Sequence, residues 1–292
     1  MAEWTGVRDK RILITGGTRG IGLAAAHAFA RRGAQVAIVA RNAERGAEAA
    51  RSIDEDEGAH VDVLDADLTS QAAVRALADE AMARYPRIDV LVNNAGAMFA
   101  QRALTVDGFE RTWALNHLAP FLLTNLLLDR LKASAPARII TTSSDAHKGK
   151  LIPFDDLGAE RSWKGRGFTR YGETKLANIM FTRELARRLE GTGVTAYCFH
   201  PGLVATGFNR NNGALMSAAM TIVAPFARSP RKAAQTLVWL ADSPEVSKQS
   251  GGYYQDQALA VSSRQAQDPT LARRLWEVSE EQVRLASTAS AP

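Results

Sequence analysis

Two residues four positions apart, Tyr171 and Lys175, have side chains suited to proton transfer. In a helix, side chains at this spacing lie on the same face. A phenol has an ordinary pKa of about 10 and exchanges protons poorly at neutral pH, but a neighbouring cation favours the phenolate and lowers that pKa. The spacing therefore predicts that Tyr171 is a general acid/base assisted by Lys175. The alternative is an ordinary solvated helix start.

A glycine-rich turn lies between a short apolar run, residues 11–15, and a helical pattern over residues 23–32. Strand, turn and helix in this order open a dinucleotide-binding unit, in which backbone N–H groups at the helix N-terminus approach a pyrophosphate. Side chains at Gly16, Gly20 and Gly22 would obstruct that approach. The spacing is G-x-x-x-G-x-G, which differs from the standard G-x-G-x-x-G, so a purely structural turn is the alternative.

The end of the second apolar strand, residues 35–40, indicates which nicotinamide cofactor the chain prefers. A NAD site usually carries Asp or Glu at this point to bind the ribose 2′-hydroxyl, whereas this chain has Arg41. An arginine here would bind a 2′-phosphate, and Arg19 in the glycine turn could reach the same group. We therefore expect NADP(H) in preference to NAD(H), with two solvated arginines as the alternative.

The remaining sequence alternates between apolar strands and amphipathic helices. Strands are predicted over residues 11–15, 35–40, 60–64, 88–92, 137–141, 194–199 and 253–254. Helices are predicted over residues 23–32, 43–55, 71–84, 109–132, 231–241 and 271–283, with another beginning at Tyr171. This alternation implies a parallel sheet with helices on both faces. We therefore predict one α/β domain over residues 1–292, with a doubly wound Rossmann-type fold around a central parallel seven-stranded sheet.

Small and polar residues follow two of the predicted strands, at the edge where open α/β sheets bind their ligands. Asn93-Asn94-Ala95-Gly96 follows the fourth strand, where a structural turn is the alternative, and Thr142-Ser143-Ser144 follows the fifth. The long helix between them is interrupted near Asn116 and Pro120. A buried asparagine among apolar neighbours needs hydrogen-bond partners, which makes Asn116 a candidate functional residue.

Together these motifs resemble the short-chain dehydrogenase/reductases in order and spacing, over nearly the whole chain. The motifs are Thr15-Gly16-x-x-x-Gly20-Ile21-Gly22, Asn93-Asn94-Ala95-Gly96, Asn116, Ser144, Tyr171-x-x-x-Lys175 and Pro201-Gly202-x-x-x-Thr206. Within the family the sequence resembles the retinol-dehydrogenase and WW-domain-oxidoreductase-like branch. The features that suggest this branch are the long step from Ser144 to Tyr171, the segments 175–179 and 184–189, and the tail 272–276.

The resemblance implies a role for each candidate residue. Tyr171 would donate a proton to the substrate oxygen, while Lys175 would lower its pKa and hold the nicotinamide ribose. Ser144, with Ser143 as its rival, would hydrogen-bond the carbonyl oxygen, and Asn116 would position a water in a proton relay. These donors would stabilise and protonate the developing oxyanion as hydride is transferred. The implied cofactor-binding residues are Gly16, Thr18, Arg19, Gly20, Ile21, Gly22, Arg41, Asp67, Leu68, Asn94, Ala95, Gly96, Tyr171, Lys175, Pro201, Gly202, Val204 and Thr206.

The same resemblance assigns parts of the cofactor to particular segments. Asp67 and Leu68 would flank the adenine, residues 94–96 would contact the adenosine ribose, and residues 201–206 would contact the nicotinamide. Residues 203–230 are expected to close over the substrate as a lid. Their apolar, Met-rich composition suits a hydrophobic aldehyde, ketone or alcohol, because a flexible thioether repacks easily. Two short helices packed on the core are the alternative.

The composition of the 292-residue chain excludes several other classes of function. Its 36 basic residues are scattered among 31 acidic ones, so the net charge of +5 does not indicate a nucleic-acid partner. The five histidines, among them His147 as a loop histidine, and the single cysteine show no metal-binding spacing. Residues 1–10 form a charged lead without an apolar run, and no stretch reaches the ~20 residues of a membrane span. We therefore expect a soluble cytoplasmic protein without a metal.

Two functions from different classes fit the sequence. The first is an NADP(H)-dependent oxidoreductase, a carbonyl reductase or alcohol dehydrogenase, which we expect to be a homodimer. The second is an NADP(H)-binding regulator or scaffold that keeps the fold without turnover. The first is favoured because the catalytic set is complete, whereas such regulators often lose it. A methyltransferase on a similar sheet is not favoured, because its chemistry does not require Tyr171 with Lys175. Residues 287–292 are expected to be a disordered tail.

Overall fold

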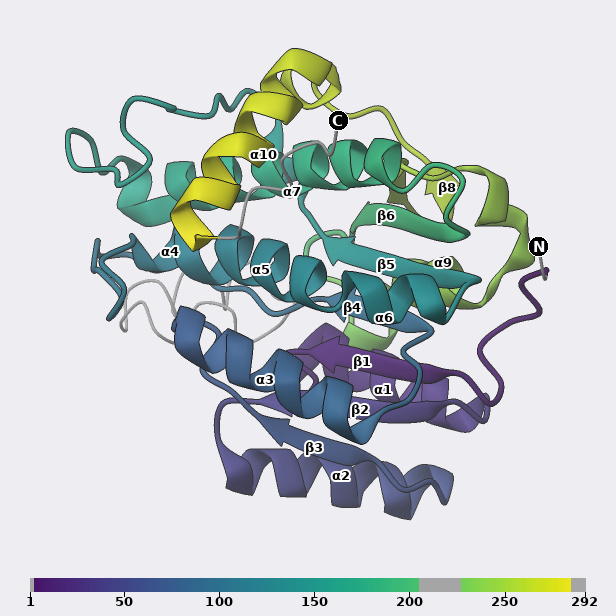
Figure 1. Cartoon of the computed structure of the whole chain (residues 1–292). Coiled ribbons are helices and arrows are strands. Elements are labelled where there is room, and N and C mark those ends of the chain that lie inside the picture. The colour runs from purple at the N-terminus through teal and green to yellow at the C-terminus, as the bar shows by residue number, and fades with distance from the viewer. Residues whose placement is uncertain (1–2, 205–226, 285–292) are drawn as a thin grey trace.

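An eight-stranded sheet forms the centre of the protein, in the strand order β3-β2-β1-β4-β5-β6-β7-β8 (Figure 1). The structure is a computed structural model, described here for residues 3–204 and 227–284. Thr206, most of the predicted lid and the predicted tail at 287–292 lie outside the described residues. The strands are β1 (Arg11–Thr15), β2 (Gln35–Ala40), β3 (Asp62–Asp65), β4 (Val90–Asn93), β5 (Ala137–Thr142), β6 (Val194–His200), β7 (Tyr253–Gln255) and β8 (Ala258–Leu259).

The parallel sheet predicted from the sequence is confirmed, with one additional strand. β1 to β7 pair in parallel throughout, so the seven predicted strands are present. The eighth, β8, pairs antiparallel with β7 at the edge. The prediction of seven strands missed β8 because it is only two residues long and both residues are exposed. Such a segment has no alternation of apolar and polar residues from which a strand could be predicted.

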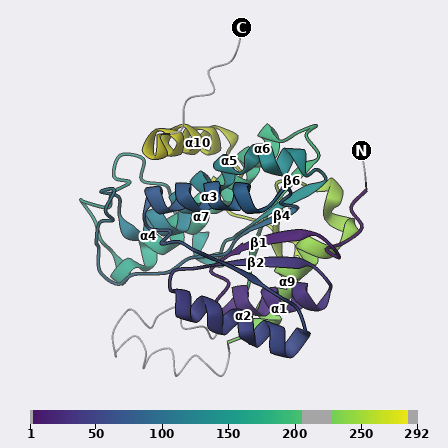
Figure 2. The same cartoon turned by 60° about the horizontal axis from the view of Figure 1, so that its bottom comes forward.

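Helices cover both faces of the sheet, as Figure 2 shows from a second direction. Helices α1, α2 and α9 lie on one face, and α3, α5, α7 and α10 on the other. The bounds are α1 (Gly20–Arg31), α2 (Ala43–Glu57), α3 (Gln71–Arg84), α4 (Arg111–Trp113), α5 (Ala119–Leu126), α6 (Leu128–Ala133), α7 (Phe168–Arg188), α9 (Pro230–Asp242) and α10 (Pro269–Val283). Short 3-10 turns span Asp145–His147, Gly165–Gly167, Pro244–Lys248 and Gln265–Gln267.

The two faces of the sheet have separate hydrophobic cores because consecutive strand residues point to opposite sides. In β1, Ile12 and Ile14 pack with Phe29 of α1 in one core, whereas Leu13 packs in the other core with Phe121 of α5. All three β1 residues are fully buried. Burial on both faces explains why the strands are continuous apolar runs rather than alternating ones.

The interruption predicted within residues 109–132 is confirmed. Between α4 and α5 the chain forms one π-helical turn, Ala114–Leu118, and α6 follows α5 after a single residue. The side chain of Asn116 lies in this turn and is completely buried. π-helical turns of this kind occur frequently at functional sites, so the local geometry agrees with the choice of Asn116 as a candidate.

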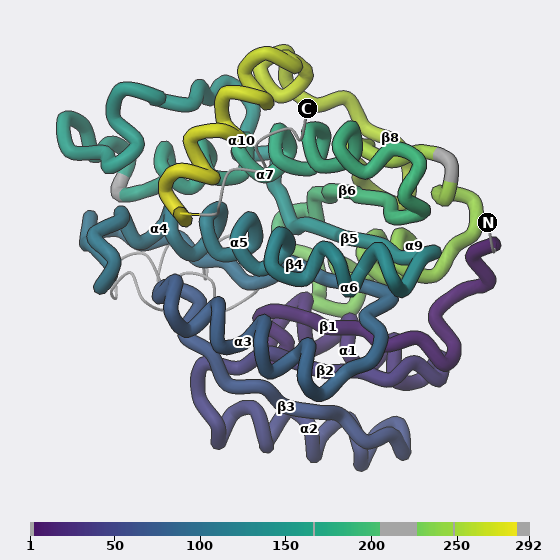
Figure 3. Tube along the Cα trace, viewed as in Figure 1, coloured from purple at the N-terminus to yellow at the C-terminus, as the bar shows by residue number. Residues whose placement is uncertain are grey.

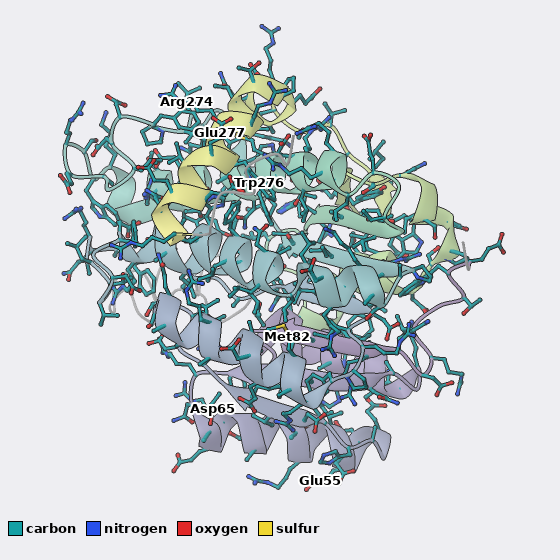
Figure 4. All side chains as sticks on the ribbon, viewed as in Figure 1. Glu55, Asp65, Met82, Arg274, Trp276 and Glu277 are labelled. Atoms are coloured by element: carbon teal, nitrogen blue, oxygen red, sulfur yellow. The ribbon has the colours of Figure 1, made fainter. Side chains whose placement is uncertain are left out.

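Helix α10 covers α7 with one face and exposes the other. Trp276 is buried, with its ring centre 4.9 Å from that of Phe121 and 5.8 Å from that of Phe181 on α7. Arg274 and Glu277, on the same helix, are exposed (Figure 4). The aromatic contacts fix α10 against α7, which is the helix that carries Tyr171 and Lys175.

The N-terminal segment runs along the edge of the molecule before it enters β1 (Figure 3). It is held by the end of α9, because the indole N–H of Trp4 donates to the carbonyl of Asp242. The guanidinium of Arg138, fully buried on β5, lies 4.2 Å from the centre of the Trp4 ring. It donates to the carbonyls of Leu240 and Ala241, at 2.6 and 3.1 Å. One arginine thus joins β5, the N-terminal segment and the last turn of α9.

Replacing this buried arginine should destabilise the fold. Arg138→Leu leaves the two α9 carbonyls without their donor, so we expect the free energy of unfolding to fall by about 2–4 kcal/mol. Urea denaturation of the variant measures the loss. Arg273→Leu, at an exposed position on α10, is the control and should change the free energy of unfolding by less than about 0.5 kcal/mol. A loss for Arg138→Leu no larger than that of the control would contradict the assignment.

Candidate active site

The candidate site lies at the carboxyl edge of the sheet, between β1 and β4. The strand order reverses at this pair, and open α/β sheets bind ligands in the crevice that such a reversal creates. Thr15, the last residue of β1, holds the crevice together: its hydroxyl donates to the carbonyl of Val92 at 3.2 Å. The same oxygen accepts from the backbone N–H groups of Asn94 and Ala95, at 3.0 and 3.1 Å. The glycine turn after β1 and the segment after β4 are therefore adjacent.

A cavity of about 1000 Å³ opens at this edge, at the upper end of the volumes typical of small-molecule sites. It brings together most of the residues that the sequence predicts. Those lining it are Gly16, Thr18, Arg19, Gly20, Ile21, Arg41, Asp67, Leu68, Asn94, Ala95, Gly96, Ser144, Tyr171, Lys175, Pro201, Gly202 and Val204. Gly22 and Asn116 lie behind the lining, and Thr206 is outside the described residues.

The glycine turn has the geometry that a bound dinucleotide requires. A Cβ at Gly22 would lie 2.2 Å from the carbonyl oxygen of Gly16, and one at Gly16 would lie 2.9 Å from the Cα of Ala95. Gly16 and Gly20 have φ of +66° and +57°, which other residues rarely adopt. Gly20 and Ile21, at the start of α1, line the cavity beyond this turn, and the first backbone N–H groups of a helix have no partner within the helix itself. The turn therefore fits the pyrophosphate of a nicotinamide dinucleotide.

Three arginines line the end of the cavity next to α2. Arg19 and Arg41 were predicted there from the sequence, and Arg45 joins them. The Asn42 side chain caps α2 by accepting from the backbone N–H of Arg45, which places Arg41 and Arg45 around the start of one helix. Arg45 was not predicted as a site residue, although its place in the first turn of the helix that follows Arg41 was a usable signal.

Ser144, Tyr171 and Lys175 meet at the opposite end of the cavity. The phenol of Tyr171 is hydrogen-bonded to the side chain of Ser144. The ammonium of Lys175 lies 5.3 Å from the centre of the Tyr171 ring and donates to the carbonyl of Thr142 at 3.0 Å. Lys175 is almost completely buried, whereas Ser144 and Tyr171 are partly exposed to the cavity. The serine and the tyrosine are therefore accessible to a substrate, and the lysine supports them from behind.

The structure also separates the two candidate serines. The hydroxyl of Ser143 is buried and donates to the backbone carbonyl of Lys175 at 2.7 Å. This bond attaches α7 to the end of β5. The hydroxyl of Ser144 contacts Tyr171 and accepts from the N–H of Ala146. This arrangement favours Ser144 over Ser143 as the residue that faces a substrate oxygen.

The prediction that the pKa of Tyr171 is lowered is wrong. Burial raises the pKa of the Tyr171 phenol to about 12, and the hydrogen bond to Ser144 offsets only part of this. Burial also lowers the pKa of Lys175 to about 8. Desolvation therefore dominates the pKa of this phenol. A phenol with a pKa of about 12 is protonated at neutral pH, so Tyr171 carries a proton there.

Asn116 does not line the cavity, but its side chain holds neighbouring segments of the site together. Its side-chain oxygen accepts from the backbone N–H of Ala97, and its amide nitrogen donates to the carbonyl of Ala97 and to the hydroxyl of Thr174. These bonds tie the π-helical turn to the chain after β4 and to α7. They satisfy the buried amide, as its burial requires. Its role in a proton relay stays a prediction.

Two histidines near the site have structural contacts. His147 lies in the short turn after Ser144 and is completely buried. Its Nδ1 donates to the carbonyl of Ser144 at 2.7 Å, and its Nε2 accepts from the N–H of Ser263 at 3.1 Å. Burial lowers the pKa of His147, so its ring is neutral and supports the Ser144 segment. The ring of His200 accepts from the N–H of Asp145.

The described residues also bear on metal binding, membrane spans and the state of the cysteine. No cluster of three His, Cys, Asp or Glu side chains suited to a metal ion occurs within residues 3–204 and 227–284. Within the same residues, every helix is too short or too polar to cross a membrane. Cys198 is a buried free thiol, as its place in an apolar strand predicts.

A doubly wound sheet, a glycine turn that fits a pyrophosphate, and a Ser-Tyr-Lys group in one cavity define a nicotinamide-dependent oxidoreductase site. The family model for short chain dehydrogenases matches residues 10–216. The chain therefore belongs to the short-chain dehydrogenase/reductase family, in its retinol dehydrogenase-like branch.

Individual relatives support the same family assignment. Retinol dehydrogenase 12 from Mus musculus is 43% identical over 275 residues, which cover 94% of this chain and 86% of that protein. A proposed daunorubicin C-13 ketoreductase from Streptomyces sp. (strain C5) is 44% identical over 274 residues, covering 94% and 92%. Among solved structures, L-sorbose reductase from Gluconobacter frateurii, complexed with NADPH and L-sorbose, has a TM-score of 0.68 and 26% identity, covering 86% of this chain and 95% of that one.

Burial of the charged Lys175 ammonium should lower the free energy of unfolding at neutral pH. Between the lowered pKa of about 8 and the ordinary value of 10.5, the unfolded chain binds a proton that the folded chain does not, so stability rises with pH through this window. Below pH 8 the full cost of burying the charge is present. Lys175→Met should therefore raise the free energy of unfolding at pH 7 by about 1–3 kcal/mol.

Urea denaturation at pH 7 and pH 10.5 measures this gain, which should shrink at the higher pH. Lys132→Met, at an exposed position on α6, is the control and should show no such pH dependence. A Lys175→Met variant that is less stable than the wild type at pH 7 would show that the lysine stabilises the fold.

Proposed function

We propose that the protein is an NADP(H)-dependent oxidoreductase that transfers a hydride between the nicotinamide and a hydrophobic aldehyde, ketone or alcohol. The observation that carries this proposal is the single cavity, which joins the three arginines and the glycine turn at one end to Ser144, Tyr171 and Lys175 at the other. Cofactor and substrate would thus meet beside one proton donor.

Each side chain of the site has its own role in the reduction of a carbonyl group. A bound nicotinamide dinucleotide supplies the hydride. The hydroxyls of Ser144 and Tyr171 donate hydrogen bonds to the substrate oxygen and stabilise the negative charge that develops on it. Tyr171 then transfers its proton to that oxygen, and the ammonium of Lys175 stabilises the phenolate that remains. In oxidation the same groups work in reverse, with the phenolate as the base.

The preference for NADP(H) is supported by the charges around the start of α2. Where a NAD site carries an acidic residue, this chain has Arg41, and Arg19 and Arg45 line the same end of the cavity. Three cations and a helix N-terminus favour a phosphate dianion. The related L-sorbose reductase was solved with NADPH.

The preference for an apolar substrate is supported by the wall beyond the catalytic group. Met98, Phe99, Leu115, Phe168 and Leu203 line the cavity there. The names of two relatives, a retinol dehydrogenase and a proposed daunorubicin ketoreductase, also refer to bulky molecules with large apolar parts.

Removal of the proton donor tests the reaction. For Tyr171→Phe we expect the rate of NADPH oxidation with apolar aldehydes and ketones to fall by about 10² to 10⁴, with NADPH binding retained. The matched control is Tyr85→Phe, a buried tyrosine outside the cavity, which should keep the wild-type rate. If NADPH binds tightly but the wild type turns over none of the carbonyl compounds, the regulator hypothesis becomes the better account.

Removal of the arginines tests the cofactor preference. Arg41→Ala and Arg45→Ala should each raise the KM for NADPH by about 10- to 100-fold, because each removes a charged hydrogen bond to the 2′-phosphate, and should leave the KM for NADH nearly unchanged. Arg51→Ala, on the exposed side of α2 and outside the cavity, is the control. Equal KM values for NADPH and NADH in the wild type would refute the preference.

A further inference from the structure

Besides Lys175, two lysines line the cavity, and they differ in their partners. Lys148 is exposed, and its ammonium lies 2.9 Å from the carboxylate of Asp145, so its charge is paired. Lys150 is partly buried, and no ion pair within 4.0 Å forms at its ammonium among the residues that the structure describes. No role was predicted for either residue from the sequence.

The stem of Lys150 lies directly on the helix that carries the proton donor. A Cβ at Gly172, the residue after Tyr171, would lie 2.4 Å from the carbonyl oxygen of Ala146, 2.8 Å from the Cε of Lys150 and 2.9 Å from its Cγ. The missing side chain at Gly172 therefore makes room for the Ala146 carbonyl and for the lysine stem. The ammonium lies 5.7 Å from the centre of the Phe168 ring, one turn earlier on α7. Lys150 thus places a cation over the Phe168 ring in a cavity that Tyr171 also lines.

The acidic group nearest to this cation along α7 is already held by another residue. Glu173 accepts from the guanidinium of Arg170 at 3.1 Å, and the same guanidinium donates to Glu110 at 3.0 Å. Burial raises the pKa of Glu173, and of the two cations that oppose this rise Arg170 has a larger effect than Lys150. The ammonium of Lys150 thus lies over the Phe168 ring, forms no ion pair within 4.0 Å among the described residues, and belongs to a side chain that lines the cavity. A partly desolvated cation in this position favours an anion in the cavity.

We propose that Lys150 selects substrates that carry a carboxylate remote from the reacting carbon, with Phe168 packing against the apolar part of the molecule. This proposal rests on the proposed function and makes it narrower: the preferred substrate is an apolar carbonyl compound, or the corresponding alcohol, with an acidic end. Lys150 acts through substrate binding, so its effect falls mainly on KM rather than on kcat.

Matched pairs of substrates test the assignment on the full-length protein. The probes are aryl ketones with a carboxylate on a chain of one to four methylenes, each compared with its methyl ester, with NADPH as the reductant. We expect the wild type to show a kcat/KM for the best acid about 10- to 100-fold above that for its ester, as a charged hydrogen bond would give. Lys150→Met keeps the apolar stem and should abolish this ratio, whereas Lys150→Arg should retain most of it.

Lys148→Met serves as the matched variant on the same loop. Because the ammonium of Lys148 is paired with Asp145, we expect its removal to leave the acid-to-ester ratio within about twofold of the wild-type ratio. A wild type that reduces acids and esters equally well overturns the proposal. So does a ratio that survives in Lys150→Met or that is lost in Lys148→Met.

Calorimetric binding separates this proposal from the proposed function. With NADPH present, the wild type should bind the acid more tightly than the ester, and Lys150→Met should bind both alike, whether or not turnover follows. Equal binding of acid and ester by the wild type overturns the role of Lys150. Tighter binding of the acid without reduction of either probe supports the role of Lys150 and counts against the proposed reaction.

Discussion

The contact on which the site depends is the hydrogen bond from the buried ammonium of Lys175 to the carbonyl of Thr142, at the end of β5. Two further bonds join the same elements: the hydroxyl of Ser143 donates to the carbonyl of Lys175, and the amide of Asn178 donates to the carbonyl of Thr142. Helix α7 is thereby fixed to the carboxyl edge of the sheet at three points. Tyr171, one turn before Lys175, is placed beside Ser144 as a consequence of these bonds.

Burying charge around α7 is tolerated because each charged group has partners supplied by the surrounding elements. Arg170, next to Tyr171, donates to Glu110, and Glu110 accepts from the backbone N–H groups of Thr112 and Trp113 at the start of α4. This network connects α7 with the π-helical turn that contains Asn116. Such a network is costly to disturb, since removing one member leaves the others buried and unpaired. The precision of the site therefore comes from polar contacts as much as from the two apolar cores.

The sequence predicts most of the fold and the position of the site, because periodic burial and the glycine turn are local signals. It does not predict β8, which is too short for a pattern, nor the buried partners of His147. The pKa of Tyr171 is predicted in the wrong direction because spacing along a helix says nothing about desolvation, which depends on the whole surrounding structure. Lys150 could not be assigned from the sequence either, since its place depends on the missing side chain at Gly172 on a different element.

Hydride transfer itself is the most direct test of this account. NADPH carrying deuterium at the transferred position is incubated with the protein and an apolar aldehyde, and the alcohol is examined by mass spectrometry. We expect deuterium on the carbinol carbon of the product with the wild type, and almost none with Tyr171→Phe in the same time. Alcohol formed without deuterium, or labelled equally by the variant, would contradict the role of Tyr171 as proton donor in a nicotinamide-dependent reduction.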